Sequence, residues 1–217
     1  MKLAPGLLGL LCSVTLAGCS TTSQGPAKTG VAPAPAAHAG PATTASATGS
    51  TGGRYTEADI SFMKGMIAHH SQAVLIAGWA PTHDASPSLR ALCERIVVGQ
   101  KDEIAFMQRW LHDRNQEVPS GDTAHARMPG MEHQMLMPGM LTADQLDQLD
   151  RAKGVEFDSL FLRDMIRHHQ GALTMVNQLF GTPGAAQDDL VFKFASDMNA
   201  DQTIEIERMN KMLAALP

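Results

Sequence analysis

Apolar residues recur at intervals of three and four along four long segments of the chain. This spacing puts them on one face of an α-helix with polar residues opposite, and it is typical of amphipathic helices. The four stripes cover residues 62–76, 89–110, 157–175 and 190–212. We find no alternating pattern of a length that would predict a β-strand. The pattern therefore predicts an all-α domain with four long helices.

The ends of these stripes carry the residues that begin and end helices. Thr56, with an aspartate three residues later, predicts an N-terminal cap for the first helix, and Pro81 predicts its end. Ser86 precedes a proline, which is tolerated at the first helical position, and predicts the start of the second helix. Thr142 predicts the cap of an extra short helix, and residues 181–184 predict the turn before the fourth stripe.

Each half of the domain repeats the same order of residues. A phenylalanine and a methionine lead to a pair of histidines at 62–70 and again at 161–169. Each pair is followed, on the next helix, by Gln-x2-Glu-Ile-x2-Met-x3-Leu, at 100–111 and at 202–213. The repeat predicts a duplicated helical hairpin, and two such hairpins predict a four-helix bundle.

The N-terminal residues predict export and a lipid anchor. The apolar run 7–16 is too short to span a bilayer, and it leads to Leu16-Ala17-Gly18-Cys19, which resembles the lipobox of bacterial lipoproteins. We therefore interpret residues 1–19 as a lipoprotein signal peptide with Cys19 as the lipidated residue. An ordinary signal peptide cut near the same position is the alternative.

Composition divides the rest of the chain into a tether and a folded domain. Residues 20–53 are mostly Ala, Pro, Gly, Ser and Thr with almost no charge, so they predict a disordered tether. Residues 54–217 predict the folded domain, with a connection of distinct character at 114–141 between its hairpins. The formal charge of −5 and the lack of a basic stretch argue against nucleic acid as a partner. Cys93 is the single cysteine of that domain, which excludes an internal disulfide.

The repeated histidine pairs predict metal ligands. Neighbouring helical residues point about 100° apart, so at least one histidine of each pair should face the interior beside the preceding methionine. Thioether sulfur with imidazole nitrogen favours copper, above all Cu(I). The alternative is a hydrogen-bonded core histidine with its neighbour solvated, and the repetition favours ligands over it. The candidate ligands in the helices are Met63, Met66, His69, His70, Met165, His168 and His169.

Two glutamates are candidates for supporting these histidines. Gln100 with Glu103, and Gln202 with Glu205, fall on or near the apolar stripes of their helices. A buried carboxylate needs a partner, and either glutamate would orient a histidine through its second ring nitrogen or bind metal itself. The alternative places both glutamates at the edge of the bundle with lysine or arginine partners.

The connection 114–141 contains the phrase Met-Pro-Gly-Met twice. Pro-Gly at the centre of a turn favours type II, which brings the two flanking methionines within about 7 Å of each other. These methionines are candidate ligands for a soft metal, namely Met128, Met131, Met137 and Met140. The alternative is that they cover one end of the bundle. Cys93 is interpreted as a small buried apolar residue, with a thiolate ligand as the alternative.

These motifs together resemble the CopM-like family of bacterial periplasmic copper-binding proteins, long known as a domain of unknown function. The resemblance rests on residues 66–70, 165–172 and 137–142 and on the Glu-Ile-x2-Met stretches, and it covers about 55–214. It implies a ferritin-like fold, a link to copper tolerance and delivery, and Met and His ligands at the two histidine motifs.

The expected function is a non-enzymatic envelope protein that sequesters or delivers copper, with a periplasmic transporter or acceptor as its partner. A ferritin-like metal oxidase is the first alternative. Di-iron bundles place a glutamate three residues before a ligating histidine, and Met66 and Met165 occupy that place here. A metal-free helical interaction module is the second alternative.

Overall fold

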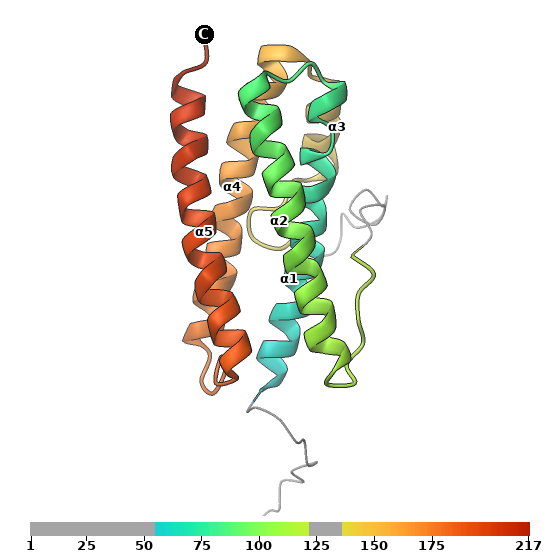
Figure 1. Ribbon diagram of the computed structural model, residues 1–217, viewed down its shortest axis with the longest axis vertical. Coiled ribbons are helices and arrows are strands. Elements are labelled where there is room, and N and C mark those ends of the chain that lie inside the picture. Colours follow the sequence, from blue (N-terminus) through green and yellow to red (C-terminus); the bar gives the residue numbers. More distant parts are fainter. Residues whose placement is uncertain (1–54, 122–135) are drawn as a thin grey trace, which may run out of the picture. The chain divides into compact units, whose positions relative to one another are not determined.

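The computed structural model describes residues 55–121 and 136–217. All regular structure in these two ranges is helical (Figure 1). The elements are α1 (Glu57–Ala77), a 3₁₀ turn (Ala80–Thr82), α2 (Pro87–His112), α3 (Ala143–Arg151), α4 (Gly154–Gly181) and α5 (Asp189–Ala214). The prediction of an all-α domain is confirmed.

The four long helices form a ferritin-like bundle of two hairpins. α1 packs along α2 and α4 packs along α5, and the hairpins meet where α1 contacts α4. α1 and α4 are therefore the inner pair, each packed along two other long helices, while α2 and α5 are the flanking helices, each packed mainly along its own hairpin partner. The short helix α3 contacts α4. Among the described helices, none is long and apolar enough to cross a membrane.

The helix ends follow the predicted signals. Thr56 and Asp59 form a reciprocal capping box, in which the Thr56 N–H donates to the Asp59 carboxylate over 2.7 Å. The Ser86 hydroxyl caps α2 by accepting from the backbone N–H of Leu89. Thr142 caps α3 with a second capping box. Satisfying these otherwise free N–H groups fixes where each helix begins.

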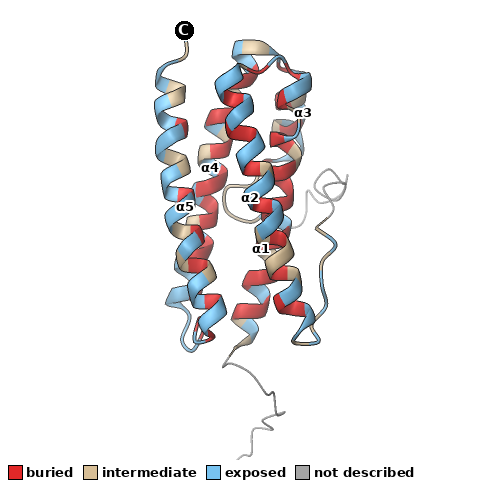
Figure 2. Ribbon diagram, in the orientation of Figure 1, coloured by how far each residue is buried: buried red, intermediate tan, exposed pale blue. Residues whose placement is uncertain are grey.

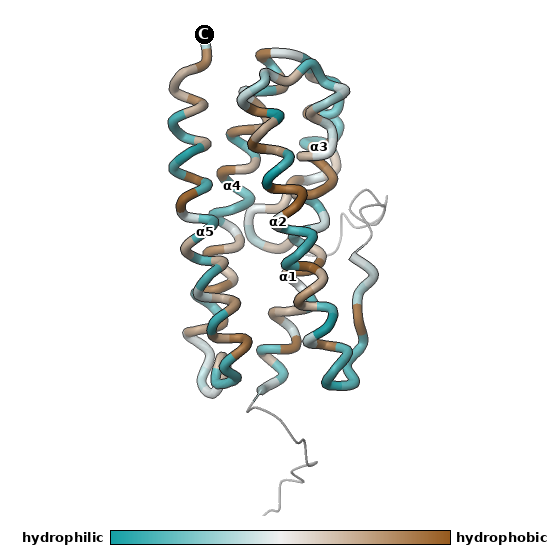
Figure 3. Tube along the Cα trace, in the orientation of Figure 1, coloured by the Kyte–Doolittle hydropathy of each residue, from teal (hydrophilic) through white to brown (hydrophobic). Residues whose placement is uncertain are grey.

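Methionine, leucine and phenylalanine fill the interior of the bundle. Figure 2 shows the buried residues on the facing sides of the helices, and Figure 3 shows apolar and polar bands following one another along them. The core forms two clusters. Met63, Met66 and Met107 belong to one cluster, and Met165 and Met209 belong to the other.

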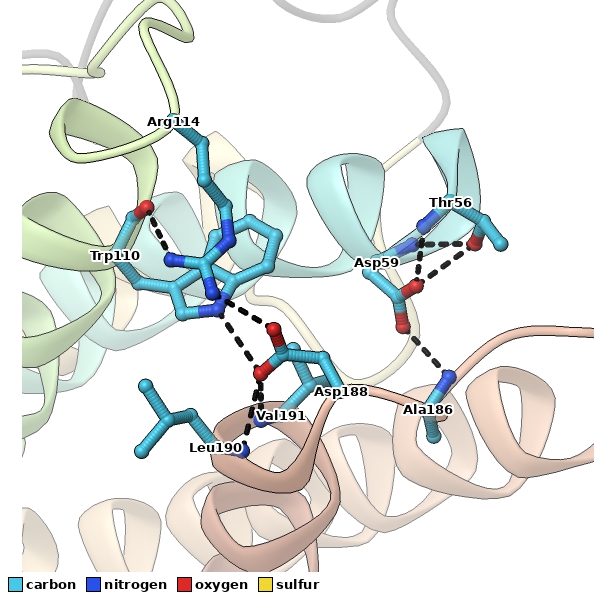
Figure 4. A network of polar contacts seen from close by, with 8 residues as sticks. All are labelled: Thr56, Asp59, Trp110, Arg114, Ala186, Asp188, Leu190 and Val191. Atoms are coloured by element: carbon cyan, nitrogen blue, oxygen red, sulfur yellow. Dashed lines mark hydrogen bonds and ion pairs between the residues drawn. The ribbon is translucent and has the colours of Figure 1, made fainter. Parts of the chain in front are cut away.

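One end of the bundle is closed by a polar network (Figure 4). The Asp59 carboxylate accepts a hydrogen bond of 2.7 Å from the N–H of Ala186, in the loop before α5. Asp188 caps α5 and forms a 2.7 Å ion pair with Arg114, whose guanidinium lies 4.1 Å from the ring centroid of Trp110. The contacts tie the start of α1 and the end of α2 to the start of α5, and so fix the register of the two hairpins.

Candidate metal centre

All four histidines of the repeated motif are buried. None of His69, His70, His168 and His169 exposes more than 1% of its surface. The alternative of a solvated outer histidine is therefore wrong for both pairs. Both histidines of a pair are buried because α1 and α4 each have packed neighbours on two sides. Two side chains that point about 100° apart are therefore both covered.

One histidine of each pair meets its counterpart at the centre of the bundle. The rings of His69 on α1 and His168 on α4 have centroids 3.8 Å apart and are tilted by 37°. The other two point toward the flanking helices, where His70 reaches α2 and His169 reaches α5. The four imidazoles thus form one layer across the bundle.

The two outer histidines each donate a hydrogen bond to a glutamate. His70 Nε2 lies 2.8 Å from a carboxylate oxygen of Glu103, and His169 Nε2 lies 2.7 Å from that of Glu205. A carboxylate accepts, so Nε2 carries a proton in both rings and Nδ1 is the nitrogen that faces away from the glutamate. Both glutamates lie at the bundle edge, with side chains 24% and 26% exposed, but they pair with histidine rather than with lysine or arginine.

The central histidines are also held in a defined state. His69 Nε2 donates to the carbonyl oxygen of Pro138 over 3.0 Å, which leaves its lone pair on Nδ1. Burial lowers the pKa of His69 to about 3, and the neighbouring His70 acts in the same direction. Burial, followed by the nearby imidazole of His69, also lowers the pKa of His168 well below its usual value. Both rings are neutral at physiological pH.

Each of the four imidazoles keeps one buried nitrogen free for a ligand. Considering the described residues alone, no hydrogen-bond partner is found for Nδ1 of His69, His70 and His169 or for Nε2 of His168. In His69, whose ring is neutral, this nitrogen is the one that the hydrogen bond to Pro138 leaves unprotonated. A neutral imidazole with its second nitrogen fixed by a neighbour is the usual form of a metal-ligating histidine.

The turn between the hairpins lies against the imidazole layer. The N–H of Met140 donates to the carbonyl of Met137 over 3.2 Å, and Gly139 has a φ of +78°, as the predicted type II turn requires. Gln72 of α1 holds the backbone of Leu141 with both ends of its amide, over 2.8 and 3.0 Å. On α4, Gly171 leaves the space in which the turn packs.

The thioethers lie on both sides of this layer. Met63, Met66 and Met165 are fully buried. Met66 precedes its histidines by one turn on α1, and Met165 does the same on α4. The two helices run antiparallel, so these methionines lie toward opposite ends of the bundle and belong to different core clusters. The two sulfurs are therefore kept apart, one on the histidine-bearing helix of each hairpin.

Further sulfur comes from positions near the turn. Met137 Sδ lies 3.2 Å from the place that a Cβ on Gly65 would take, and the ε-methyl of Met175 lies 3.5 Å from it. Met175 was recognisable in the sequence as part of a helical stripe but carried no sign of being near the turn. Met137 and Met140 are half-buried.

Three of the predicted site residues lie outside the described residues, namely Cys19, Met128 and Met131. Cys93 is buried, and burial with the nearby Asp158 carboxylate raises the pKa of its thiol to about 12. A protonated, buried thiol agrees with its interpretation as a small apolar residue.

Histidine and carboxylate alone do not complete a metal site. Over residues 55–121 and 136–217, no group of three or more His, Cys, Asp and Glu side chains is placed to hold an ion. The nearby methionine sulfurs are not part of that set, and nitrogen with thioether sulfur is a combination that suits soft ions.

The fold and this layer define a class, a four-helix bundle with a buried layer of imidazoles and buried thioethers near it. The family model of DUF305, a domain of unknown function, matches residues 59–213. The chain belongs to the DUF305 family.

Solved structures of similar proteins agree with this assignment. A DUF305 fragment from Deinococcus radiodurans is 27% identical with a TM-score of 0.60, covering 75% of this chain and 99% of that one. A DUF305 protein from Streptomyces coelicolor, described as a candidate secreted protein, is 25% identical with a TM-score of 0.61, covering 72% and 92%. CopM in its Cu(II)-bound form is 28% identical with a TM-score of 0.57, covering 72% and 95%. CopM has also been solved with Cu(I) and with silver.

A curated relative matches over a short segment. The uncharacterized protein L153 of Acanthamoeba polyphaga mimivirus is 32% identical over 56 residues, which cover 26% of this chain. The chain spans 37% of the length of that relative.

Proposed function

We propose that this protein binds copper as cargo inside the bundle, Cu(I) above all and Cu(II) through its imidazoles, and sequesters or delivers it. The observation that carries the proposal is the layer of four buried imidazoles. Three of them donate from Nε2 to an acceptor, and the other nitrogen of each ring is buried and has no partner among the described residues. Such nitrogens next to buried thioethers suit a soft, exchangeable ion.

The relatives support the same ion. CopM, which shares the fold at 28% identity, has been solved with Cu(I), with Cu(II) and with silver. Silver and Cu(I) are both soft monovalent ions. The ligands that we propose are Met66, His69, His70, Met165, His168 and His169, with Met63 as an additional sulfur in the first half.

The methionines of the connection form a second part of the proposal. Met128, Met131, Met137 and Met140 would capture Cu(I) ahead of the buried layer. The position of Met137 beside Gly65 of α1 supports this role, because its sulfur already lies next to the helix that carries His69. Methionine ligands exchange readily, which suits capture and transfer.

The proposed location is the bacterial cell envelope. The signal peptide predicted at 1–19 would export the chain, and lipidation of Cys19 would anchor it through the tether at 20–53. A periplasmic copper transporter or acceptor would be the partner. The description of the Streptomyces coelicolor relative as a candidate secreted protein supports export.

The proposed role is binding rather than catalysis. A ferritin-like oxidase uses a glutamate three residues before each ligating histidine, and here those positions are Met66 and Met165. Thioethers in place of carboxylates disfavour hard-metal oxygen chemistry.

A copper titration of the purified domain tests the proposal. We expect replacement of His69 and His168 together by alanine to weaken Cu(I) binding at least tenfold in competition with bathocuproine, while the far-ultraviolet circular dichroism stays helical. His112→Ala is the matched control, because His112 is an exposed histidine of α2. Unchanged Cu(I) affinity in the folded double variant would refute the buried site.

A further inference from the structure

A crevice between α2 and α5 lies next to the imidazole layer. It has a volume of about 260 Å³, and its lining residues come from these two helices. The lining includes Glu103 and Glu205, the carboxylates that accept hydrogen bonds from His70 and His169. The two glutamate side chains are 24% and 26% exposed, while both histidine side chains are fully buried. Each glutamate therefore lies between solvent and a buried imidazole.

Two glutamine side chains separate the crevice from the interior of the bundle. Gln100 and Gln202 occupy corresponding positions of the repeat, and both line the crevice although they are only 4% and 3% exposed. Their Oε1 atoms are buried, and the described part of the chain provides neither atom with a hydrogen-bond partner. The NH₂ group is therefore the end of each amide that reaches the crevice. A change of rotamer breaks no hydrogen bond at the amide oxygen, so these side chains can move at low cost.

On α1 and α4, by contrast, the layer is covered by hydrogen-bonded backbone. His69 donates to the carbonyl of Pro138, and Gln72 holds Leu141 with both ends of its amide. The turn packs so closely on α4 that a Cβ on Gly171 would lie 1.9 Å from the carbonyl oxygen of Pro138. Opening this side breaks several hydrogen bonds and a packed contact, whereas opening the crevice side requires the movement of side chains alone.

The crevice also has room for a passing ion. Gly99 lines it, and a Cβ at this position would meet none of the described atoms within 4 Å beyond its own helix backbone. The lining contains three carboxylates, the third from Asp201, and two arginine guanidinium groups. Its formal excess of one negative charge, three against two, does not repel a monovalent cation.

We propose that this crevice is the route by which copper enters and leaves the imidazole layer, with Gln100 and Gln202 as the side chains that move aside. The inference rests on the proposed copper binding and adds the path of exchange. An ion in the layer moves from a buried imidazole past the carboxylate that holds the same ring, and from there into solvent. An acceptor therefore takes the ion from the face formed by α2 and α5.

Gly99→Trp closes the proposed route, because the indole fills open space instead of displacing packed atoms. The protein is loaded with Cu(I) and mixed with excess bathocuproine, and the absorbance of the bathocuproine complex gives the rate of release. We expect release at least tenfold slower than from the unmodified protein, with the Cu(I) affinity at equilibrium unchanged. An obstacle in a path slows exchange equally in both directions, whereas lost ligands or lost packing would change the affinity.

Val98→Trp is the matched control. Val98 is the neighbouring residue of α2, is 63% exposed and does not line the crevice, so the same indole there should leave the release rate as it is. A second variant opens the route instead of closing it. Replacement of Gln100 and Gln202 together by alanine should accelerate release at least threefold, because the side chains that must move are removed.

Equal release rates from the Gly99→Trp and Val98→Trp variants would overturn the route, and so would slower release matched by an equal gain in affinity. If circular dichroism shows that Gly99→Trp does not fold, an unchanged release rate in the double alanine variant overturns the route by itself. The equilibrium affinity tests copper binding, and the ratio of release rates tests the path. A protein that binds Cu(I) but releases it equally fast from every variant would keep the proposed function and refute the route.

Discussion

The two hairpins contain the same histidine–glutamate pair but meet the connecting turn differently. Within α1 and α2, His70 lies 2.8 Å from Glu103, and within α4 and α5, His169 lies 2.7 Å from Glu205. The two distances are nearly equal because each pair is made inside one hairpin. A contact between the two helices of one hairpin is retained in both copies when the hairpin is duplicated.

The turn breaks the symmetry at one position of the repeat. The residue six places after the methionine is Gln72 in α1 and Gly171 in α4. Gln72 binds the backbone of Leu141, whereas Gly171 leaves room for the carbonyl of Pro138. A single connection cannot be duplicated, so the two halves of the repeat hold it from opposite sides. As a result, the Nε2 atom of His69 donates to Pro138, while His168 has no corresponding acceptor in the turn among the described residues.

The largest effect that we expect concerns the two central histidines. Their folded-state pKa values lie below 6.5, near 3 for His69 and well below 6.5 for His168, so the unfolded chain binds more protons between these limits. Their contribution to stability is complete above pH 6.5 and is lost as the pH falls toward 3. At pH 5 the loss for His69 is about 2 kcal/mol, and His168 acts in the same direction.

Urea unfolding of the metal-free domain at pH 7.5 and pH 5 measures this loss. His69→Gln with His168→Gln should reduce the difference between the two pH values, because glutamine does not titrate. A pH dependence equal to that of the unmodified domain would show that these imidazoles are not the cause.

A smaller effect on stability is expected from adding a side chain at Gly171 of α4, where the turn packs against the helix. A Cβ on Gly171 would lie 1.9 Å from the carbonyl oxygen of Pro138 and 2.8 Å from the Cα of Gly139. We expect Gly171→Ala to displace the turn and to lower the free energy of unfolding by about 3 kcal/mol.

Thermal and urea unfolding measure this change. Gly99→Ala is the matched control, since none of the described atoms beyond its own helix backbone lies within 4 Å of a Cβ there. Alanine in that exposed helical position should raise stability by up to about 1 kcal/mol. If both variants were equally stable, the turn would not be packed against α4 as described.

The smallest effect concerns the one sulfur that distinguishes the halves. Met63 in α1 corresponds to Leu162 in α4. We expect Met63→Leu to change the free energy of unfolding by less than about 1.5 kcal/mol, because the volumes match. If Met63 is a ligand, the same change weakens Cu(I) binding severalfold, and Leu162→Met strengthens it. A bathocuproine titration in which neither variant differs from the unmodified domain would assign Met63 to packing alone.

The helices and their ends were predictable because their signals are local. Thr56 and Ser86 accept hydrogen bonds from backbone N–H groups in the first turn of their own helices, and the apolar spacing indicates which face of each helix is buried. The burial of both histidines in a pair was not predictable in this way. It depends on α1 and α4 being the inner helices, which is decided by contacts between hairpins.

The sequence alone determined the helical segments, their duplication and the histidine and methionine residues of each motif. Each of these features depends on residues that are close together in the chain. Tertiary structure alone decided that His69 lies 3.8 Å from His168 by ring centroid, that Met66 and Met165 fall on opposite sides, and that Gln72 holds Leu141. These contacts join segments distant in the chain, and their geometry follows from the antiparallel packing of α1 on α4.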